Sequence, residues 1–268
     1  MASARLFLRA VSLPLYIAAL GCNKKQEIFM SIELVLFDLD GTLLPLDQDV
    51  FVKAYFSALA KNMAEHGYDP DKLIKAVWSG TLDMIRNNGE GTNEEVFWEG
   101  EKEIFGDGII EDKPLFAEFY EKDFDKVKDV CGYNENARAA VERIKAMGLR
   151  VALATNPVFP AVATEHRMAW AGFTPADFEL YTTYENSRYC KPNPLYYGEI
   201  CGKLSVEPSR CLMVGNDVSD DMSAEELGMK VFLLTDCLIN KGDADISRYP
   251  RGSFAELIEY IEALMTLR

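Results

Sequence analysis

One stretch decides the fold: Ile32-Glu33-Leu34-Val35-Leu36-Phe37 runs directly into Asp38-Leu39-Asp40-Gly41-Thr42. The apolar run predicts a buried strand, and a chain that breaks into a loop after it can aim both carboxylates into one crevice. In open α/β sheets, ligands bind outside the carboxyl ends of the strands. Gly41 permits close backbone approach to a ligand, and Thr42 adds a hydroxyl. The stretch therefore predicts a ligand site, against the alternative of a solvated Asp-x-Asp-Gly turn.

Three later segments strengthen the prediction of a ligand site. Two of them are again apolar runs that end in polar residues: Val151-Ala152-Leu153-Ala154 before Thr155-Asn156, and Cys211-Leu212-Met213-Val214 before Gly215-Asn216-Asp217-Val218-Ser219-Asp220-Asp221. The third, Cys190-Lys191-Pro192-Asn193-Pro194, holds a lysine on a loop that two prolines stiffen. Together they offer carboxylates for a divalent cation, a hydroxyl for an anion and a positive charge. Such a set of groups suits a phosphate.

These four ordered motifs, which span residues 38–221, resemble those of the haloacid dehalogenase superfamily of phosphatases. The resemblance implies that Asp38 is the nucleophile and that Asp40 is the general acid and base. It also implies that Thr155 holds the transferring phosphoryl group and that Lys191 bridges nucleophile and phosphate. The phosphate-binding residues implied in this way are Gly41, Thr42, Thr155, Asn156 and Lys191.

Each implied role has a chemical reason. A carboxylate nucleophile forms an acyl phosphate, which splits one difficult displacement into two easier ones. Because Asp38 and the phosphate are both anionic, Mg²⁺ and Lys191 would offset their repulsion. The acid at residue 40 favours phosphoester chemistry, since the resemblance implies that the dehalogenase and phosphonate-cleaving branches lack an acid there. We therefore expect a Mg²⁺-dependent phosphatase that hydrolyses a small phosphorylated metabolite through an aspartyl-phosphate.

The fourth motif departs from the commonest family form, which reads Gly-Asp where this chain reads Gly215-Asn216. Either Asn216 takes the usual acidic position, or one extra residue precedes Asp217. We favour Asp217 as the direct ligand, because a carboxylate neutralises Mg²⁺ and an amide does not. Asp221 would orient metal-bound water or Lys191. The expected metal set is Asp38, Asp40, Asn216, Asp217 and Asp221.

Two other functions fit the same motifs. A phosphomutase of the superfamily uses the same acid and would move phosphate between positions of its substrate. A binding or regulatory module without catalysis would retain the fold alone. Hydrolysis of a generic aryl phosphate with Mg²⁺ distinguishes the enzyme from the silent module.

The composition is that of an acidic enzyme rather than a nucleic-acid-binding or membrane protein. The chain has 28 basic and 43 acidic residues, a net charge of −15, which repels nucleic acid and anionic membranes. The six cysteines form no Cys-x-x-Cys pair and no zinc pattern, so we expect reduced thiols in a cytoplasmic protein. They are Cys22, Cys131, Cys190, Cys201, Cys211 and Cys237.

We expect residues 1–30 to lie outside the fold. An apolar stretch from Ala10 to Gly21 is too short for a membrane span and is interrupted by Pro14. One interpretation is a secretory leader with Cys22 as a lipid-modified residue, which would make the protein exported or lipid-anchored. The other, which we favour, is a start codon assigned too early, with Met30 as the first residue.

The spacing of the motifs predicts where a second domain is inserted. Asp38 and Thr155 are 117 positions apart, far more than one crossover needs, whereas Thr155 and Lys191 are only 36 apart. Residues 47–131 therefore form the expected cap, and residues 31–46 with 132–268 form the expected catalytic core. Apolar residues three and four apart predict cap helices at 49–65, from 69, from 93 and at 113–122.

The rest of the core alternates between strands and helices, which implies a doubly wound, mostly parallel, Rossmann-like α/β sheet. We expect strands at residues 150–154, 178–183, 211–214 and 230–234. We expect helices at residues 135–147, 160–171, 194–203 and 253–265, and an irregular loop near the site at 236–249.

Overall fold

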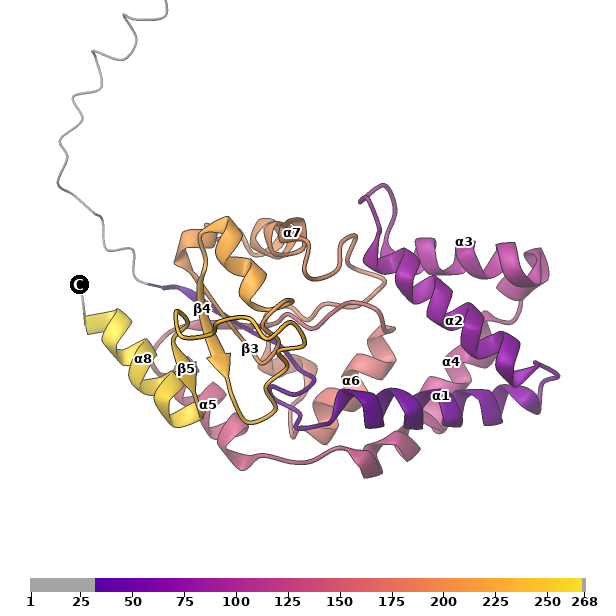
Figure 1. Cartoon of the computed structure of the whole chain (residues 1–268), viewed down its shortest axis with the longest axis horizontal. Coiled ribbons are helices and arrows are strands. Elements are labelled where there is room, and N and C mark those ends of the chain that lie inside the picture. The colour runs from indigo at the N-terminus through magenta and orange to yellow at the C-terminus, as the bar shows by residue number, and fades with distance from the viewer. Residues whose placement is uncertain (1–31, 267–268) are drawn as a thin grey trace, which may run out of the picture.

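The computed structural model describes residues 32–266, and the predicted leader or early start at 1–30 lies outside this range. Five parallel strands form one sheet in the order β2-β1-β3-β4-β5. The strands are β1 (Leu34–Phe37), β2 (Arg150–Leu153), β3 (Cys211–Gly215), β4 (Lys230–Leu234) and β5 (Arg251–Gly252). The predicted α/β class with a parallel sheet is confirmed (Figure 1).

Helices cover both faces of the sheet. On one face, Val35 and Phe37 of β1 pack in a core shared with α5 (Glu135–Ala146) and α8 (Phe254–Thr266). On the other, Leu34 and Leu36 pack with α7 (Pro194–Leu204) and the 3₁₀ helix η6 (Met222–Leu227). Because both faces are buried, β1 and β3 read as continuous apolar runs rather than alternating ones. The other 3₁₀ helices described in this part are η4 (Pro175–Asp177) and η5 (Pro208–Arg210).

The strand register brings the ends of β1, β2 and β3 together. Phe37 lies opposite Leu153 on one side and Val214 on the other. The next residues continue this pairing, since the Asp38 amide donates to the Val214 carbonyl (2.9 Å) and the Ala154 amide to the Phe37 carbonyl (2.6 Å). The polar residues that follow all three strands therefore meet at one edge of the sheet.

A helical lobe, residues 48–130, separates β1 from α5 and lies to one side of the sheet (Figure 1). Its first three helices begin within two residues of the predicted starts, where the side chains of Asp47, Asp69 and Thr92 accept from the first-turn amides of α1, α2 and α3. The elements are α1 (Gln48–Ala64), α2 (Pro70–Ile85), α3 (Asn93–Phe105), η2 (Asp107–Ile110), α4 (Lys113–Lys122) and η3 (Phe124–Val130). None of the helices within 32–266 is long and apolar enough to span a membrane.

The lobe contacts the sheet part at several places, among them the start of α3, where the Asn93 amide donates to the Ser187 carbonyl at 2.8 Å. The outgoing and returning chains pair at Leu46 and Cys131, and the Gly132 amide donates to the Pro45 carbonyl at 2.7 Å. Farther out, α6 (Ala161–Trp170) packs against α4 and η3. Phe159, in the loop before α6, has its ring edge-on to Phe51 and Tyr55 of α1.

One predicted strand is wrong. Residues 178–183 form only an isolated bridge, between Tyr181 and Leu153. The segment lies along β2, where the Leu153 amide donates to the Leu180 carbonyl at 2.8 Å and the Thr182 amide to the Leu153 carbonyl at 3.1 Å. The chain then turns away, because the Thr183 amide bonds the Asn186 side chain. The predicted loop at 236–249 contains no helix or strand, and β5 after it was not predicted.

Candidate active site

Lys191 lies between two carboxylates at the carboxyl edge of the sheet. Its ammonium nitrogen is 2.8 Å from Oδ1 of Asp38, which follows β1, and 2.7 Å from Oδ1 of Asp221, which follows β3. The Lys191 and Asp221 side chains are 2% and 1% exposed, and that of Asp38 is 11% exposed. Three residues far apart in the sequence thus form one buried charge cluster that opens at Asp38.

The pKa values in this cluster reflect burial and charge together. Burial raises the pKa of Asp38 to about 7, with Lys191 opposing the rise and the Asp221 and Asp40 charges adding to it. Burial alone would lower the pKa of Lys191, but the Asp221 and Asp38 charges outweigh it and hold that pKa well above its ordinary value. Lys191 therefore stays cationic, and a further positive charge beside Asp38 would favour its ionised, nucleophilic form.

The turn after β1 brings Asp38 close to Asn216. The Thr42 hydroxyl lies 2.9 Å from Oδ1 of Asn216 and 3.4 Å from Oδ2 of Asp38. Gly41 has φ +80°, and a Cβ there would lie within 3.0 Å of the Asn216 amide nitrogen. That nitrogen donates to the Cys237 carbonyl at 2.7 Å, which directs the amide oxygen toward Thr42. Only glycine fits at residue 41, for both steric and conformational reasons.

Asp217 faces its own loop instead. Its Oδ1 accepts from the backbone amides of Ser219 (2.7 Å) and Asp220 (3.0 Å), and its own amide donates to Oδ2 of Asp221 (2.9 Å). Gly215 leaves room for Asp221, since a Cβ at 215 would overlap that carboxylate. These contacts shape the loop so that Asn216 and Asp221, rather than Asp217, touch the residues around Asp38.

The loop after β2 supplies Thr155 and Asn156. Thr155 is buried, and its carbonyl accepts from the hydroxyls of Thr182 (2.7 Å) and Tyr196 (2.8 Å). Oδ1 of Asn156 accepts from the Lys191 amide at 3.2 Å. The second and third motifs are therefore fixed to each other, as their expected joint role with a phosphate requires.

Arg167 is a site residue that the sequence motifs do not reveal. Its side chain is 1% exposed, and its guanidinium forms an ion pair with Oδ2 of Asp40, donates to the Thr164 hydroxyl (3.2 Å) and lies 4.5 Å from the centre of the Phe159 ring. Oδ1 of Asp40 is buried and has no hydrogen-bond partner among residues 32–266. The available signal was a basic residue on the inward face of α6, which also carries Ala163.

A metal ion in this site would have few protein ligands. Within residues 32–266, no group of three or more His, Cys, Asp and Glu side chains is arranged to hold one. The donors that converge are Oδ2 of Asp38 and Oδ1 of Asn216, which share Thr42. Mg²⁺ prefers oxygen ligands and retains several waters, so this pair of oxygens fits it.

Comparisons with known proteins show which family this chain resembles. The family model described as "haloacid dehalogenase-like hydrolase" matches residues 32–228. A phosphoglycolate phosphatase from Nitrosospira multiformis is 26% identical over 203 residues, 76% of this chain and 83% of that protein. One from Mannheimia succiniciproducens is 26% identical over 216 residues, 76% of this chain and 85% of that protein.

Solved structures share the fold. A haloacid dehalogenase-type phosphatase from Thermococcus onnurineus gives a TM-score of 0.55 at 17% identity, covering 86% of this chain and 98% of its own. A 2-haloacid dehalogenase from Pseudomonas syringae gives 0.56 at 21% identity, covering 87% and 98%. The family match spans well over half of the chain and confirms the expectation of an enzyme that is a hydrolase. This chain belongs to the haloacid dehalogenase-like hydrolases.

Proposed function

We propose that this hydrolase is a Mg²⁺-dependent phosphomonoesterase that forms an aspartyl-phosphate on Asp38. The observation that carries the proposal is the position of Lys191, which is buried and bonded to Asp38 and Asp221 at once. A dianionic phosphate can approach a carboxylate only where fixed positive charge offsets the repulsion. The phosphoglycolate phosphatases among the relatives support phosphoester chemistry.

The chemistry divides between Asp38 and Asp40. A carboxylate oxygen of Asp38 attacks phosphorus, the bond from phosphorus to the leaving oxygen breaks, and Asp40 gives that oxygen a proton. Water then attacks phosphorus, Asp40 takes its proton, and the Asp38 carboxylate leaves as inorganic phosphate forms. Thr155, Asn156, Thr42 and Gly41 would hold the phosphoryl group.

The metal would be held by Asp38 and Asn216. When bound, it would supply positive charge that offsets the anionic nucleophile and phosphate. Asn216 is the better candidate than Asp217, because Oδ1 of Asp217 already accepts two backbone amides of its own loop. Asp221 would act through Lys191 and the loop backbone, and Asp40 through the leaving group, in place of direct metal contact.

Residues 47–131 would act as a cap on a core of residues 31–46 and 132–268. The pairing of the two connections at Leu46 and Cys131 supports these boundaries, because the chain enters and leaves the lobe at one place. A cap that closes over Asp38 would exclude bulk water from the acyl phosphate. We further propose a cytoplasmic location, consistent with free thiols at residues 131, 190, 201, 211 and 237.

A direct test is hydrolysis of p-nitrophenyl phosphate by the purified protein. We expect release of inorganic phosphate that requires Mg²⁺ and stops on chelation. Asp38→Asn should abolish it, and Asp40→Asn should lower kcat by roughly 10²–10⁴-fold. Transfer of phosphate between positions of a substrate without its release would indicate a phosphomutase. No Mg²⁺-dependent turnover at all would support a silent module and contradict the proposal.

A further inference from the structure

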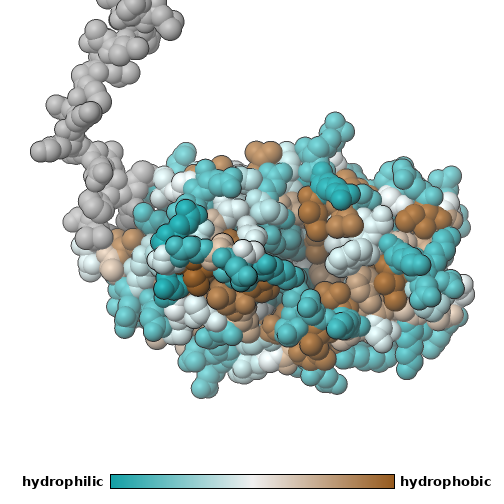
Figure 2. All heavy atoms as spheres, in the orientation of Figure 1, coloured by the Kyte–Doolittle hydropathy of each residue, from teal (hydrophilic) through white to brown (hydrophobic). Residues whose placement is uncertain are grey.

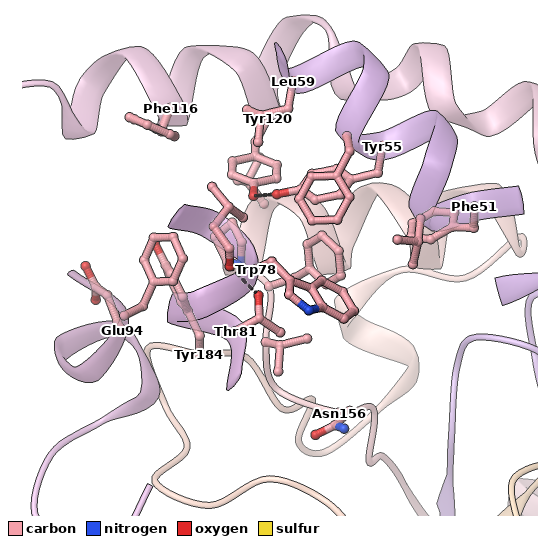
Figure 3. A pocket seen from close by; sticks show the side chains of 18 of the residues that line it. Phe51, Tyr55, Leu59, Trp78, Thr81, Glu94, Phe116, Tyr120, Asn156 and Tyr184 are labelled. Carbon is pink, nitrogen blue, oxygen red and sulfur yellow. Dashed lines mark hydrogen bonds between the residues drawn. The ribbon is translucent and has the colours of Figure 1, made fainter. Parts of the chain in front are cut away.

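A cavity of about 400 Å³ extends from the reaction site into the helical lobe, within the usual size range of small-molecule pockets. Asp40 and Asn156 are among its lining residues, and most of the others are aromatic or aliphatic. Figure 3 shows Asn156 at one end, with the rings of Tyr55 and Trp78 farther into the lobe. Because Asp40 is the proposed proton donor to the leaving oxygen, the leaving group would occupy this cavity.

The charged groups of the lining already have partners. Among the described lining residues, the single basic side chain is Lys113, which is paired with Glu94 (3.3 Å) and lies over the Trp98 ring (4.9 Å). Glu185 accepts from the Ala161 amide at the start of α6 (2.9 and 3.1 Å). A second anionic group on the substrate, such as the carboxylate of glycolate, would lose its water and find no unpaired cation.

Three of the lining hydroxyls and the rim also favour an apolar occupant. The Tyr55 and Tyr120 hydroxyls bond each other at 2.8 Å, and the Thr81 hydroxyl donates to the Val77 carbonyl at 2.8 Å (Figure 3). Trp78 lines the cavity although 49% of it is exposed, and its ring lies edge-on to Phe56. Figure 2 shows apolar side chains gathered on the face where the lobe meets the sheet part. Exposed apolar groups of this kind mark ligand-binding surfaces.

We propose that the substrate is a phosphomonoester of an alcohol with a bulky apolar group, aromatic or branched aliphatic, and no second charge. This inference rests on the phosphatase function proposed above and specifies its substrate class. The proposed substrate differs from phosphoglycolate, after which the relatives are named. Those relatives are only 22–26% identical to this chain, so their cavity linings can differ from this one.

The test compares four primary-alcohol esters whose phosphate-leaving chemistry is similar: 2-phenylethyl phosphate, ethyl phosphate, phosphoglycolate and choline phosphate. With Mg²⁺ present, we expect kcat/KM for the phenylethyl ester to exceed that for the ethyl ester by roughly 10²-fold, since each buried apolar carbon adds binding energy. Phosphoglycolate and choline phosphate should be no better than the ethyl ester. Calorimetry with a phosphonate analogue of the phenylethyl ester gives a readout that needs no turnover.

A matched pair of variants locates the effect. Trp78→Ala, at the cavity rim, should lower kcat/KM for the phenylethyl ester about tenfold more than for the ethyl ester. Val50→Ala removes a similarly exposed apolar side chain of the same lobe that does not line the cavity, and should change neither value.

The two proposals fail in different ways. A preference for phosphoglycolate or choline phosphate, or an equal effect of Trp78→Ala on both esters, would overturn the substrate class and leave the phosphatase standing. If none of the esters is hydrolysed, the phosphatase function is overturned, and with it the claim that apolar phosphomonoesters are its substrates. Calorimetry would then still show whether the cavity prefers an apolar group.

Discussion

Asn216 and Asp217 are neighbours in the chain, but their side chains face different surroundings. The Asn216 oxygen points to the Thr42 hydroxyl beside Asp38, whereas the Asp217 carboxylate accepts amides of its own loop. The sequence shows Gly-Asn where the commonest family form has Gly-Asp, but the choice between the two residues as metal ligand depends on the loop geometry.

Exchanging amide and carboxylate at these two positions tests the assignment. A new carboxylate near Mg²⁺ strengthens its binding by up to about 4 kcal/mol at an effective dielectric constant of 20. The substitution also removes the hydrogen bond from the Asn216 amide to the Cys237 carbonyl, which offsets about 1–3 kcal/mol of this gain. We therefore expect Asn216→Asp to lower the Mg²⁺ concentration for half-maximal activity about tenfold. Asp217→Asn should leave it unchanged in the same titration. A higher Mg²⁺ requirement in Asp217→Asn, with no change in Asn216→Asp, would make Asp217 the ligand.

Glu101 of α3 gives a prediction about stability. Its side chain is fully buried, neither carboxylate oxygen has a hydrogen-bond partner among residues 32–266, and burial, aided by the Asp83 charge, raises its pKa from 4.5 to about 7. The folded state thus binds a proton that the unfolded state has lost between these pH values. Stability must therefore fall as pH rises from 4.5 to 7.

Glu101→Gln removes this dependence. Between pH 5 and pH 8, the free energy of unfolding of the unmodified protein should fall relative to the variant by about 2–3 kcal/mol, since each pKa unit corresponds to about 1.4 kcal/mol. Urea unfolding at both pH values measures the difference. Glu99→Gln, at an exposed position two residues away, serves as the control and should show no such divergence. If the free energies of unfolding of Glu101→Gln and the unmodified protein change equally with pH, Glu101 ionises as readily in the folded protein as in the unfolded chain.

The site residues could be predicted from the sequence where a motif marks them, and not where tertiary packing alone places them. Asp38, Lys191 and Asp221 were predicted to meet, and they do. Arg167 was not predicted, because nothing in the α6 sequence shows which residue its guanidinium contacts. Its pairing with Asp40 exists only through the packing of α6 beside the turn after β1.

Among the elements, the turn at residues 38–42 has the strictest conformational requirement. Gly41 and Gly67 both have positive φ, but a Cβ at 41 overlaps Asn216 whereas a Cβ at 67 meets nothing within 4 Å. Gly67→Ala should cost about 1–2 kcal/mol of stability, from backbone conformation alone, and retain activity.

Gly41→Ala should cost more stability and, by displacing Asn216 from Asp38, lower kcat by roughly 10²-fold. Thermal unfolding and steady-state kinetics on the two variants measure both effects. If the two variants lose activity equally, or if neither loses any, close packing at Gly41 does not position Asn216.

The helices were predicted more closely than the strands at the sheet edges. Caps such as Asp47 and Asp69 are local signals, and they fix where α1 and α2 begin. A strand forms only where a neighbouring strand pairs with it. The segment at residues 178–183 has apolar residues, but it makes only a few hydrogen bonds to β2. For the same reason β5, with two residues at the opposite edge, has no signal of its own.

At the scale of the whole molecule, motif spacing predicted the inserted helices, because 117 positions between the first two motifs exceed what a crossover needs. The spacing does not predict the cavity between lobe and sheet. Its lining comes from α1, α2, α3, α4, α6, the loops after β1 and β2, and residues 184–185, so its apolar character appears only once these elements are packed.

The central claim is that phosphorus becomes bonded to Asp38 during turnover. In Asp40→Asn the hydrolysis step lacks its base, so the intermediate should accumulate when the leaving group, such as p-nitrophenolate, needs no acid. Peptide mass spectrometry after rapid acid quench should then find a phosphoryl group on the peptide at Asp38. No added mass there, or a phosphoryl group on another residue while phosphate is still released, would contradict the account.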